Sequence, residues 1–575
     1  MEQNIRNRNK YVSQEQEDEE NEDLLNASKK ETIVHVNDDA SSSKDTQTNA
    51  NLYSLPLRVR TLRATIYVLS KALNLAYVPL FIYRIFERRK RCTPVTDPIL
   101  KMPAVELAKK IRRKEMSCLH VVEAYICRIK EVNPLLNAVI EDRFAEALED
   151  AKKVDELVSR KDFLENEEAV AKEYPLLGVP ITIKGSLAVK GMKYTSGTRT
   201  RKDVRAEIDA DAVALARAAG AIPLLVSNVP ELCMSWETSN KLIGTTKNPH
   251  DTRRTCGGSS GGEASLLGAG ASVLGIGSDV AGSLRLPAHY CGVWGHKPTP
   301  RAVSFEGHYP DSRSRDVWEE IFTVGPMARY ATDLPTLLQV IAKPEKREML
   351  NLNEKINIKD IKIYYSEFED FYWQKPNSHC REAVTKVVDH FSKICNTKPQ
   401  KIDFFLKQNL PDMIACDILT TKDIDDEFDG NANGAFKELF KYAAFQSDHT
   451  FMLIMCGILR RLATTFSGKR KPHIDEIIGK VKKLYEGILK DNGVIIVPTF
   501  PVEAPRHGDV LRVALSSGCL SLFNGLGYPV TNCPAGATKS GIPIGIQVAS
   551  LPYGDKLTLA VAQEIERSFG GWIEP

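Results

Sequence analysis

The pattern of hydrophobic and polar positions changes character near residue 100. Residues 1–56 are polar and charged with no apolar period, which predicts a disordered tail, and no apolar core of a cleavable signal peptide follows Met1. Residues 57–92 hold one long apolar run, Ala64–Tyr83, followed by a basic flank. Beyond them, helical and strand patterns alternate, so residues 93–575 are predicted to form a single large α/β domain.

Several elements of this domain can be placed from periodicity. One helix is predicted where apolar side chains recur on one face ahead of Asn133-Pro134, which should end it. Val179–Lys184 predicts a strand that ends on a lysine, Val494–Val497 predicts a second strand, and Gly525–Gly545 is rich in turn residues. A later apolar face is expected to belong to a core helix, with an acyl channel or a membrane contact as alternatives. The first face consists of Leu119, Val122, Ile126 and Ile129, and the later one of Phe451, Leu453, Ile454, Met455, Ile458, Leu459 and Leu462.

The run Ala64–Tyr83 predicts a membrane anchor. Twenty residues at about 1.5 Å each match a hydrocarbon core of about 30 Å. However, Lys71, Asn74 and Pro79 interrupt the run, and a central lysine costs about 2.5 to 3.5 kcal/mol on insertion scales. A single-pass or interfacial anchor on an intracellular membrane is therefore expected, and a helix docked on the domain is the alternative. More basic residues follow the run than precede it, which favours a cytosolic domain.

Charge and cysteine content exclude some classes of function. The 77 Lys and Arg residues nearly balance the 74 Asp and Glu residues, so the formal charge of +3 gives no case for nucleic acid as a partner. The 12 cysteines are scattered without the spacing of a zinc site or the density of a small disulfide scaffold. Most of them are therefore expected to be free.

The candidate chemistry lies in the glycine-rich stretch Cys256–Ala288. Its glycines allow main-chain N–H groups to approach a ligand closely, as an oxyanion or anion site requires. A Walker-type phosphate loop is excluded because no Gly-Lys-Ser/Thr follows the second glycine. Residues 257–261 do satisfy the G-x-S-x-G pattern of an α/β-hydrolase nucleophile elbow, although the run GGSSGG is unusual for one.

A longer pattern resembles the amidase signature family. The segment GGSSGG, then small residues, then GSDVAGSLRLP matches that family at nearly every defined position. Other segments that resemble the family extend the match over about residues 100–572; they are Gly178–Lys184, Asn228–Glu231, Gly292–Thr299, Gly325–Arg329, Val497–Thr499 and Gly541–Gln547. The resemblance implies a central mixed β-sheet covered by helices on both faces.

The resemblance also implies a Ser-Ser-Lys triad that needs no metal or organic cofactor. In it Ser283 is the nucleophile, Ser259 is a bridging serine on a cis peptide, and Lys184 is the base. A serine hydroxyl is a weak nucleophile until a neighbour takes its proton, and a lysine can do so when burial lowers its pKa. Asp279 and Arg285 are expected to form a structural ion pair. The expected oxyanion and substrate contacts are Val280, Ala281, Gly282, Ser283 and Cys233; many family members carry glycine in place of Ala281.

The expected substrate follows from the anchor together with this triad. The membrane-associated members that the chain resembles act on fatty-acid amides, and an anchored enzyme meets such substrates at high local concentration. We therefore expect hydrolysis of primary fatty-acid amides and N-acylethanolamines to free fatty acid plus amine, with a homodimer also allowed. The alternatives are a soluble-type small-amide amidase, a glutamine-hydrolysing transamidation subunit, and an inactive membrane scaffold on this fold.

Overall fold

The structure is a computed structural model that describes most of the chain beyond residue 86. It covers residues 87–160, 167–311, 315–368, 375–402, 428, 434–467, 471–490, 492–513, 516 and 518–575. The predicted tail 1–56 and the apolar run Ala64–Tyr83 lie outside these residues. Within the described ranges, no helix combines the length and the apolar character needed to cross a membrane.

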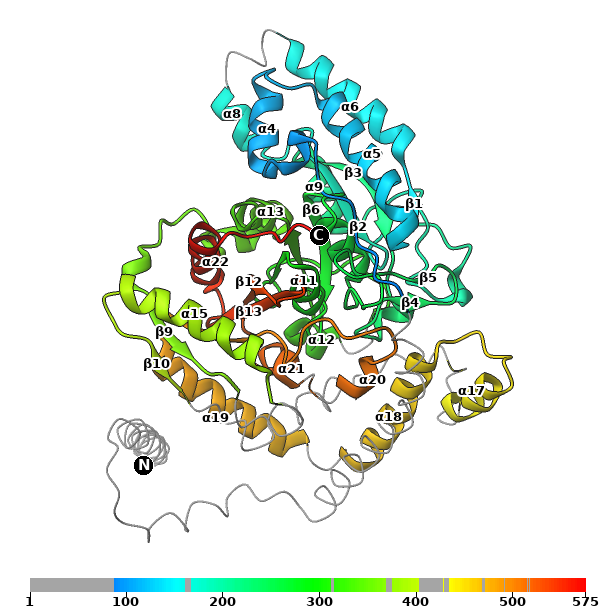
Figure 1. Cartoon of the computed structure of the whole chain (residues 1–575), viewed down its shortest axis with the longest axis vertical. Coiled ribbons are helices and arrows are strands. Elements are labelled where there is room, and N and C mark those ends of the chain that lie inside the picture. Colours follow the sequence, from blue (N-terminus) through cyan, green and yellow to red (C-terminus); the bar gives the residue numbers. More distant parts are fainter. Residues whose placement is uncertain are drawn as a thin grey trace, which may run out of the picture.

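The centre of the molecule is an eleven-stranded mixed sheet (Figure 1). Its strand order is β1-β3-β2-β6-β8-β7-β12-β13-β11-β9-β10, and β4 and β5 form a separate pair. Strand β2 runs parallel to both β3 and β6, whereas the pairs from β6 to β11 are antiparallel. The bounds are β1 Val139–Asp142, β2 Pro180–Lys184, β3 Ile222–Ser227, β4 Ser239–Asn240, β5 Gly244–Thr245, β6 Leu274–Asp279, β7 Trp294–Lys297, β8 Thr323–Ala328, β9 Lys362–Tyr365, β10 Gln400–Lys401, β11 Gly493–Pro498, β12 Val530–Ala537 and β13 Pro543–Ala549.

Helices cover both faces of this sheet, as the family resemblance implied. On β11, Val494 and Ile496 pack into one apolar cluster with α15 and α22, while Ile495 and Val497 pack into another with α19 and α21. Successive side chains of a strand point to opposite faces, so both faces of β11 are buried. The helices are α4 Ala104–Arg112, α5 Cys118–Leu136, α6 Phe144–Ser159, α8 Glu167–Glu173, α9 Asp211–Ala218, α10 Gly261–Gly268, α11 Arg285–Cys291, α12 Arg315–Ile321, α13 Leu334–Ile341, α14 Arg347–Leu350, α15 Ser378–Ile394, α17 Gly434–Ala443, α18 Phe451–Ser467, α19 Lys471–Leu489, α20 Val510–Val513, α21 Gly518–Gly525 and α22 Asp555–Phe569.

Two local predictions need correction. Helix α5 does not stop at Asn133-Pro134 but continues through Pro134 to Leu136, where Asn137 takes a left-handed conformation. A proline in the last turn removes only one backbone donor, so the helix survives it. The region predicted from its turn residues, Gly525–Gly545, instead contains β12 and the start of β13. Pro534 lies next to an irregularity in the β12 ladder, which is where a strand tolerates such residues.

Helices α17 and α18 lie at the periphery of the molecule, away from the sheet (Figure 1). The predicted core role of α18 is confirmed for Leu453, Ile454 and Ile458, which are buried, whereas Leu459 is 44% exposed. The buried side chains form a small apolar cluster with Leu232 of the main domain. Helix α18 is therefore packed against the segment that carries Cys233.

The end of the predicted anchor segment that the structure describes, residues 87–92, lies against the domain. The Cys92 N–H donates to the Pro249 carbonyl at 2.9 Å, and Arg89 Nη2 donates to the His250 carbonyl at 2.9 Å. Cys92 is 2% exposed. Part of the predicted basic flank therefore contacts the α/β domain rather than standing free of it.

Candidate active site

The predicted base Lys184 is the last residue of β2. All five residues of that strand are buried, because β2 lies between two parallel neighbours, β3 and β6. The lysine side chain is completely buried, and its Nζ lies 2.7 Å from Ser259 Oγ. The carboxyl ends of parallel strands open onto the same edge of a sheet, so residues that follow β6 are brought towards this lysine.

Ser259 precedes α10, in the glycine-rich turn between Cys256 and Gly261. Its peptide bond with Gly258 is cis, as the resemblance implied. Gly258 is required at this position, since a Cβ there would lie 2.6 Å from the Ser235 carbonyl oxygen. Among the described residues, Ser259 Oγ bonds to Lys184 and to no histidine. This geometry favours the lysine triad over the nucleophile-elbow alternative.

Ser283 follows β6 in the loop that leads into α11. The Ser260 N–H donates to its carbonyl oxygen at 3.2 Å, so the two predicted serine segments are in direct contact. Ser259 is 1% and Ser283 5% exposed. In the described part of the chain no hydrogen bond joins the two hydroxyl groups. The structure thus brings Lys184, Ser259 and Ser283 into one buried region, with the Lys184–Ser259 contact already formed.

Asp279 and Arg285 hold the loop on both sides of Ser283. Arg285 donates to the Asp279 carboxylate through Nε at 3.1 Å and Nη2 at 3.0 Å, and both side chains are completely buried. Burial alone would raise the Asp279 pKa, but Arg285 and the surrounding hydrogen bonds hold it below its ordinary value. The predicted structural ion pair is confirmed.

The expected oxyanion donors are not equivalent. The Gly282 N–H already donates to Asp279 Oδ1 at 2.8 Å. For the N–H groups of Val280, Ala281 and Ser283, no acceptor occurs within the described residues, and Val280 and Ala281 are partly exposed. The Trp236 indole donates to the Ala281 carbonyl at 3.0 Å, which fixes the loop from its other side. Three amides of the expected set are therefore available to a ligand.

Burial lowers the pKa of Lys184 below its ordinary value of 10.5. Cys233, Asp279 and Glu263 act in the opposite direction without cancelling the effect. A lysine whose positive charge is disfavoured by burial is suited to accept a proton. The Glu263 carboxyl on α10 accepts from Thr182 Oγ1 at 2.6 Å and has a pKa raised to about 7 by burial.

Cys233 lies close enough to Lys184 to act on the pKa of the lysine. It ends the short helical turn Glu231–Cys233, and its thiol is partly exposed, 3.9 Å from Ser196 Oγ. Neighbouring Glu231 bonds to His449 Nδ1 at 2.8 Å and accepts from the Thr450 N–H at 2.6 Å. These contacts tie the start of α18 to the turn that carries Cys233.

Sequence reasoning missed two polar neighbours of Lys184. Ser278 Oγ lies 2.8 Å from Lys184 Nζ, and His308 Nε2 lies 3.0 Å from Ser278 Oγ. Ser278 falls inside the motif but has no role in the resemblance. His308 is distant in sequence, and the loop between β7 and β8 brings it beside Leu187, with which it forms an isolated β-bridge.

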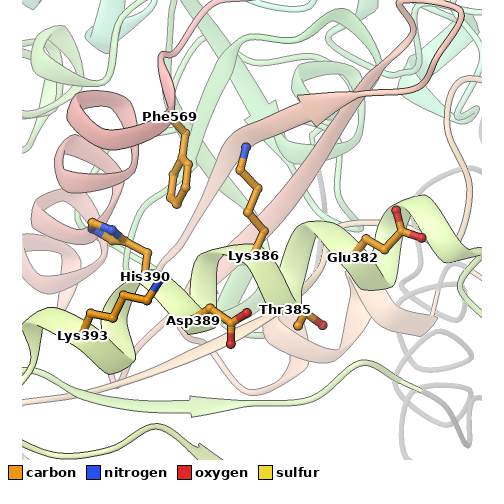
Figure 2. Close-up of a pocket in the computed structure, with 7 residues that line it drawn as sticks. All are labelled: Glu382, Thr385, Lys386, Asp389, His390, Lys393 and Phe569. Atoms are coloured by element: carbon orange, nitrogen blue, oxygen red, sulfur yellow. The ribbon is translucent and has the colours of Figure 1, made fainter.

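A groove runs along α15, with Phe569 of α22 on its other side (Figure 2). In it, Lys386 Nζ lies 4.5 Å from the centroid of the Phe569 ring, and His390 pairs with Glu564 at 2.7 Å. None of the expected site residues lines the groove, whose lining consists of Glu382, Thr385, Lys386, Asp389, His390, Lys393 and Phe569.

Comparison with known proteins gives a consistent picture. A family model described as Amidase matches residues 120–559. Fatty-acid amide hydrolase 2 of Homo sapiens is 37% identical over 84% of this chain and 92% of its own length, and fatty-acid amide hydrolase 2-B of Danio rerio is 38% identical over 85% and 93%. Indoleacetamide hydrolase of Bradyrhizobium diazoefficiens is 29% identical over 82% and 87%.

Solved structures share the fold. A fatty acid amide hydrolase aligns with a TM-score of 0.66 at 21% identity, covering 83% of this chain and 87% of its own. A 6-aminohexanoate cyclic dimer hydrolase, solved with its substrate, aligns with a TM-score of 0.64 at 23% identity, covering 82% and 97%. At this level of identity the likeness concerns the arrangement of the sheet and its helices.

Proposed function

The chain belongs to the amidase signature family and is a hydrolase of amide C–N bonds, and from this premise we propose that it cleaves fatty-acid amides through Lys184, Ser259 and Ser283. The observation that carries the triad is the 2.7 Å contact between Lys184 Nζ and Ser259 Oγ, buried beside the loop that presents Ser283. The similarity to fatty-acid amide hydrolases over most of both chains supports the substrate class.

In the proposed mechanism, Ser283 Oγ attacks the amide carbonyl as its proton passes through Ser259 to neutral Lys184. The N–H groups of Val280, Ala281 and Ser283 stabilise the oxyanion of the tetrahedral intermediate, an effect worth several kcal/mol. The Gly282 N–H stabilises the loop instead, because it already donates a hydrogen bond to the Asp279 carboxylate. Lys184 then returns the proton through Ser259 to the leaving amine, and water hydrolyses the acyl-enzyme.

Exposed aromatic side chains support the proposal of a lipid surface next to the site. Phe436 and Phe440 lie four residues apart on α17, 38% and 77% exposed, and Phe445 just beyond the helix is 98% exposed. Side chains four residues apart share one face of a helix. This face belongs to the α17–α18 pair, which packs on Leu232 beside Cys233. A membrane contact there would present a lipid amide close to the catalytic residues.

The triad is tested with Ser283→Ala, Ser259→Ala and Lys184→Ala in an oleamide hydrolysis assay. Each is expected to lose at least about 10³-fold in kcat, because the three groups act as a unit. Ser265→Ala is the matched control, since Ser265 is buried on α10 but bonds to the Lys247 carbonyl at 2.8 Å, outside the site. Wild-type turnover by Ser283→Ala would refute the mechanism, and failure of a fluorophosphonate probe to label the wild type would favour the inactive-scaffold alternative.

The substrate and the membrane contact need separate experiments. Comparable turnover of acetamide and oleamide by the detergent-purified protein would contradict the lipid assignment, and glutaminase activity with copurifying subunits would favour the transamidation alternative. Phe440→Ser/Phe445→Ser is expected to weaken flotation with phosphatidylcholine vesicles, since each buried phenylalanine contributes about 1.5 to 3 kcal/mol. Ile208→Ser, at a 73% exposed residue, is the control. Unchanged flotation of the double variant would refute the proposed surface.

A further inference from the structure

A chain of hydrogen bonds continues from Lys184 into the protein through Ser278. Lys184 Nζ lies 2.8 Å from Ser278 Oγ, which lies 3.0 Å from His308 Nε2. Ser186 Oγ also lies 2.9 Å from this nitrogen, and the other ring nitrogen of His308, Nδ1, lies 3.0 Å from the Pro310 carbonyl oxygen. The four side chains that form these hydrogen bonds, those of Lys184, Ser186, Ser278 and His308, are nearly completely buried. His308 is the most exposed of them, at 6%.

The last of these contacts fixes the tautomer of His308. A carbonyl oxygen can only accept, so His308 Nδ1 must carry the hydrogen that it donates to Pro310. Burial, the largest cause, lowers the pKa of His308 to about 3, which keeps the ring neutral. His308 Nε2 is therefore an acceptor, and the Ser278 hydroxyl at 3.0 Å can donate its hydrogen to it, as the Ser186 hydroxyl at 2.9 Å also can.

The orientation of Ser278 determines the orientation of Lys184. Having donated its hydrogen, Ser278 Oγ can only accept from Lys184, and the Ser278 carbonyl, 3.4 Å from Nζ, is a second acceptor. A neutral amine has two hydrogens and one lone pair. When both hydrogens are directed at Ser278, the lone pair faces the third oxygen neighbour, Ser259 Oγ, at 2.7 Å.

We propose that His308 is a positioning residue that, by accepting a hydrogen bond from Ser278, directs the lone pair of Lys184 towards Ser259. This inference rests on the proposed function of Lys184 as the base. Without the acceptor at residue 308, the Ser278 hydroxyl is free to donate to the lysine lone pair. It then competes with Ser259 for the lone pair that must receive the proton.

The inference is tested by steady-state kinetics of the full chain with oleamide. His308→Leu is expected to lower kcat about 10- to 100-fold, the scale of a misdirected proton transfer, with KM changed less than about twofold. His308→Gln is expected to restore most of kcat, because its amide oxygen can accept from Ser278 as Nε2 does. His308→Met, with no comparable acceptor, replaces the leucine variant if the latter does not fold.

A double-mutant cycle separates this role from a structural one. If His308 acts through Ser278, the Ser278→Ala/His308→Leu variant is expected to be no slower than Ser278→Ala alone. His250→Leu is the matched control: His250 is 1% exposed and bonds to the Cys291 carbonyl, so its loss lowers the thermal midpoint without an effect on kcat.

Three outcomes would overturn the inference: a wild-type kcat for folded His308→Leu, failure of His308→Gln to restore kcat, or independent losses that multiply in the double variant. Failure of the proposed function is distinguishable from these. It would appear as retained activity in Ser283→Ala or Lys184→Ala, whereas failure of the inference leaves both of those variants inactive.

Discussion

Replacing the carboxylate of Asp279 by an amide should disrupt the loop that carries Ser283. The carboxylate accepts hydrogen bonds from the N–H groups of Gly282 and Leu284, from Nε and Nη2 of Arg285, and from Nδ2 of Asn524. Asparagine at 279 offers one acceptor oxygen in place of two and turns a donating NH₂ group towards some of these donors. It also leaves Arg285 buried without its counter-charge.

The expected magnitude follows from the burial of the pair. Loss of one partner from a completely buried ion pair costs about 3 to 5 kcal/mol of unfolding free energy. Because Gly282 and Leu284 flank Ser283, the displaced loop should also lower kcat about 100-fold or more. Thermal midpoints at a fixed scan rate and the rate of fluorophosphonate labelling measure the two effects.

Glu149→Gln is the matched control for this experiment. Glu149 pairs with Lys152 at 2.6 Å, but both side chains are more than half exposed, and such pairs contribute about 0 to 1 kcal/mol. Its thermal midpoint should therefore stay close to that of the wild type. If Asp279→Asn unfolds at the wild-type midpoint and is labelled at the wild-type rate, the assignment of Asp279 as the support of the loop is incorrect.

Three further predictions follow from single residues. Because burial lowers the Lys184 pKa below 10.5, the unfolded chain binds a proton that the folded chain lacks between the two pKa values, so wild-type stability should rise with pH in that window. Lys184→Met should lose this dependence and be more stable at neutral pH, as thermal midpoints measured across the window would reveal; parallel curves would contradict the argument. Gly282→Ala should abolish labelling of Ser283, since Gly282 has φ +95° and a Cβ there would meet Leu520 at 2.6 Å. Gly479→Ala, in open space on α19, should instead leave the labelling of Ser283 unchanged and raise the free energy of unfolding by about 0.4 to 1 kcal/mol. Equal losses of labelling in the two variants would refute the special role of Gly282. Ile454→Ala should destabilise the packing of α18 by about 2 to 5 kcal/mol and speed proteolysis within residues 434–467, with unchanged cleavage as the contrary result.

Sequence patterns predicted the elements whose signal is local. Strand β2 and its terminal lysine were identified because the short segment Val179–Lys184 is rich in β-branched and apolar residues. Strand β12 was missed because it contains Pro534 and Gly536, residue types that usually indicate turns. The irregular pairing with β13 at this point accommodates them in the sheet.

In the site, too, residues with a local sequence signal could be predicted, whereas residues placed by the tertiary fold could not. Lys184, Ser259 and Ser283 could be named because each belongs to a motif of fixed spacing. His308 could not, because its position depends on how the loop after β7 returns over β2, where Ser186 and Ser278 lie at hydrogen-bond distance. The engagement of the Gly282 N–H by Asp279 also depends on loop conformation, which no spacing specifies.

Helix α18 is attached to the domain through Glu231 and Leu232. This attachment distinguishes a part of the protein where sequence changes are constrained from a part where they are tolerated. Lys184 and Ser278 come from β2 and β6, adjacent interior strands of the sheet, so a change in the backbone of either strand also affects the strands paired with it. Helices α17 and α18 meet the domain at its periphery through a few side chains. Residues 434–467 can therefore diverge in sequence, or be exchanged in an engineered variant, without moving the strands that hold Lys184 and Ser278.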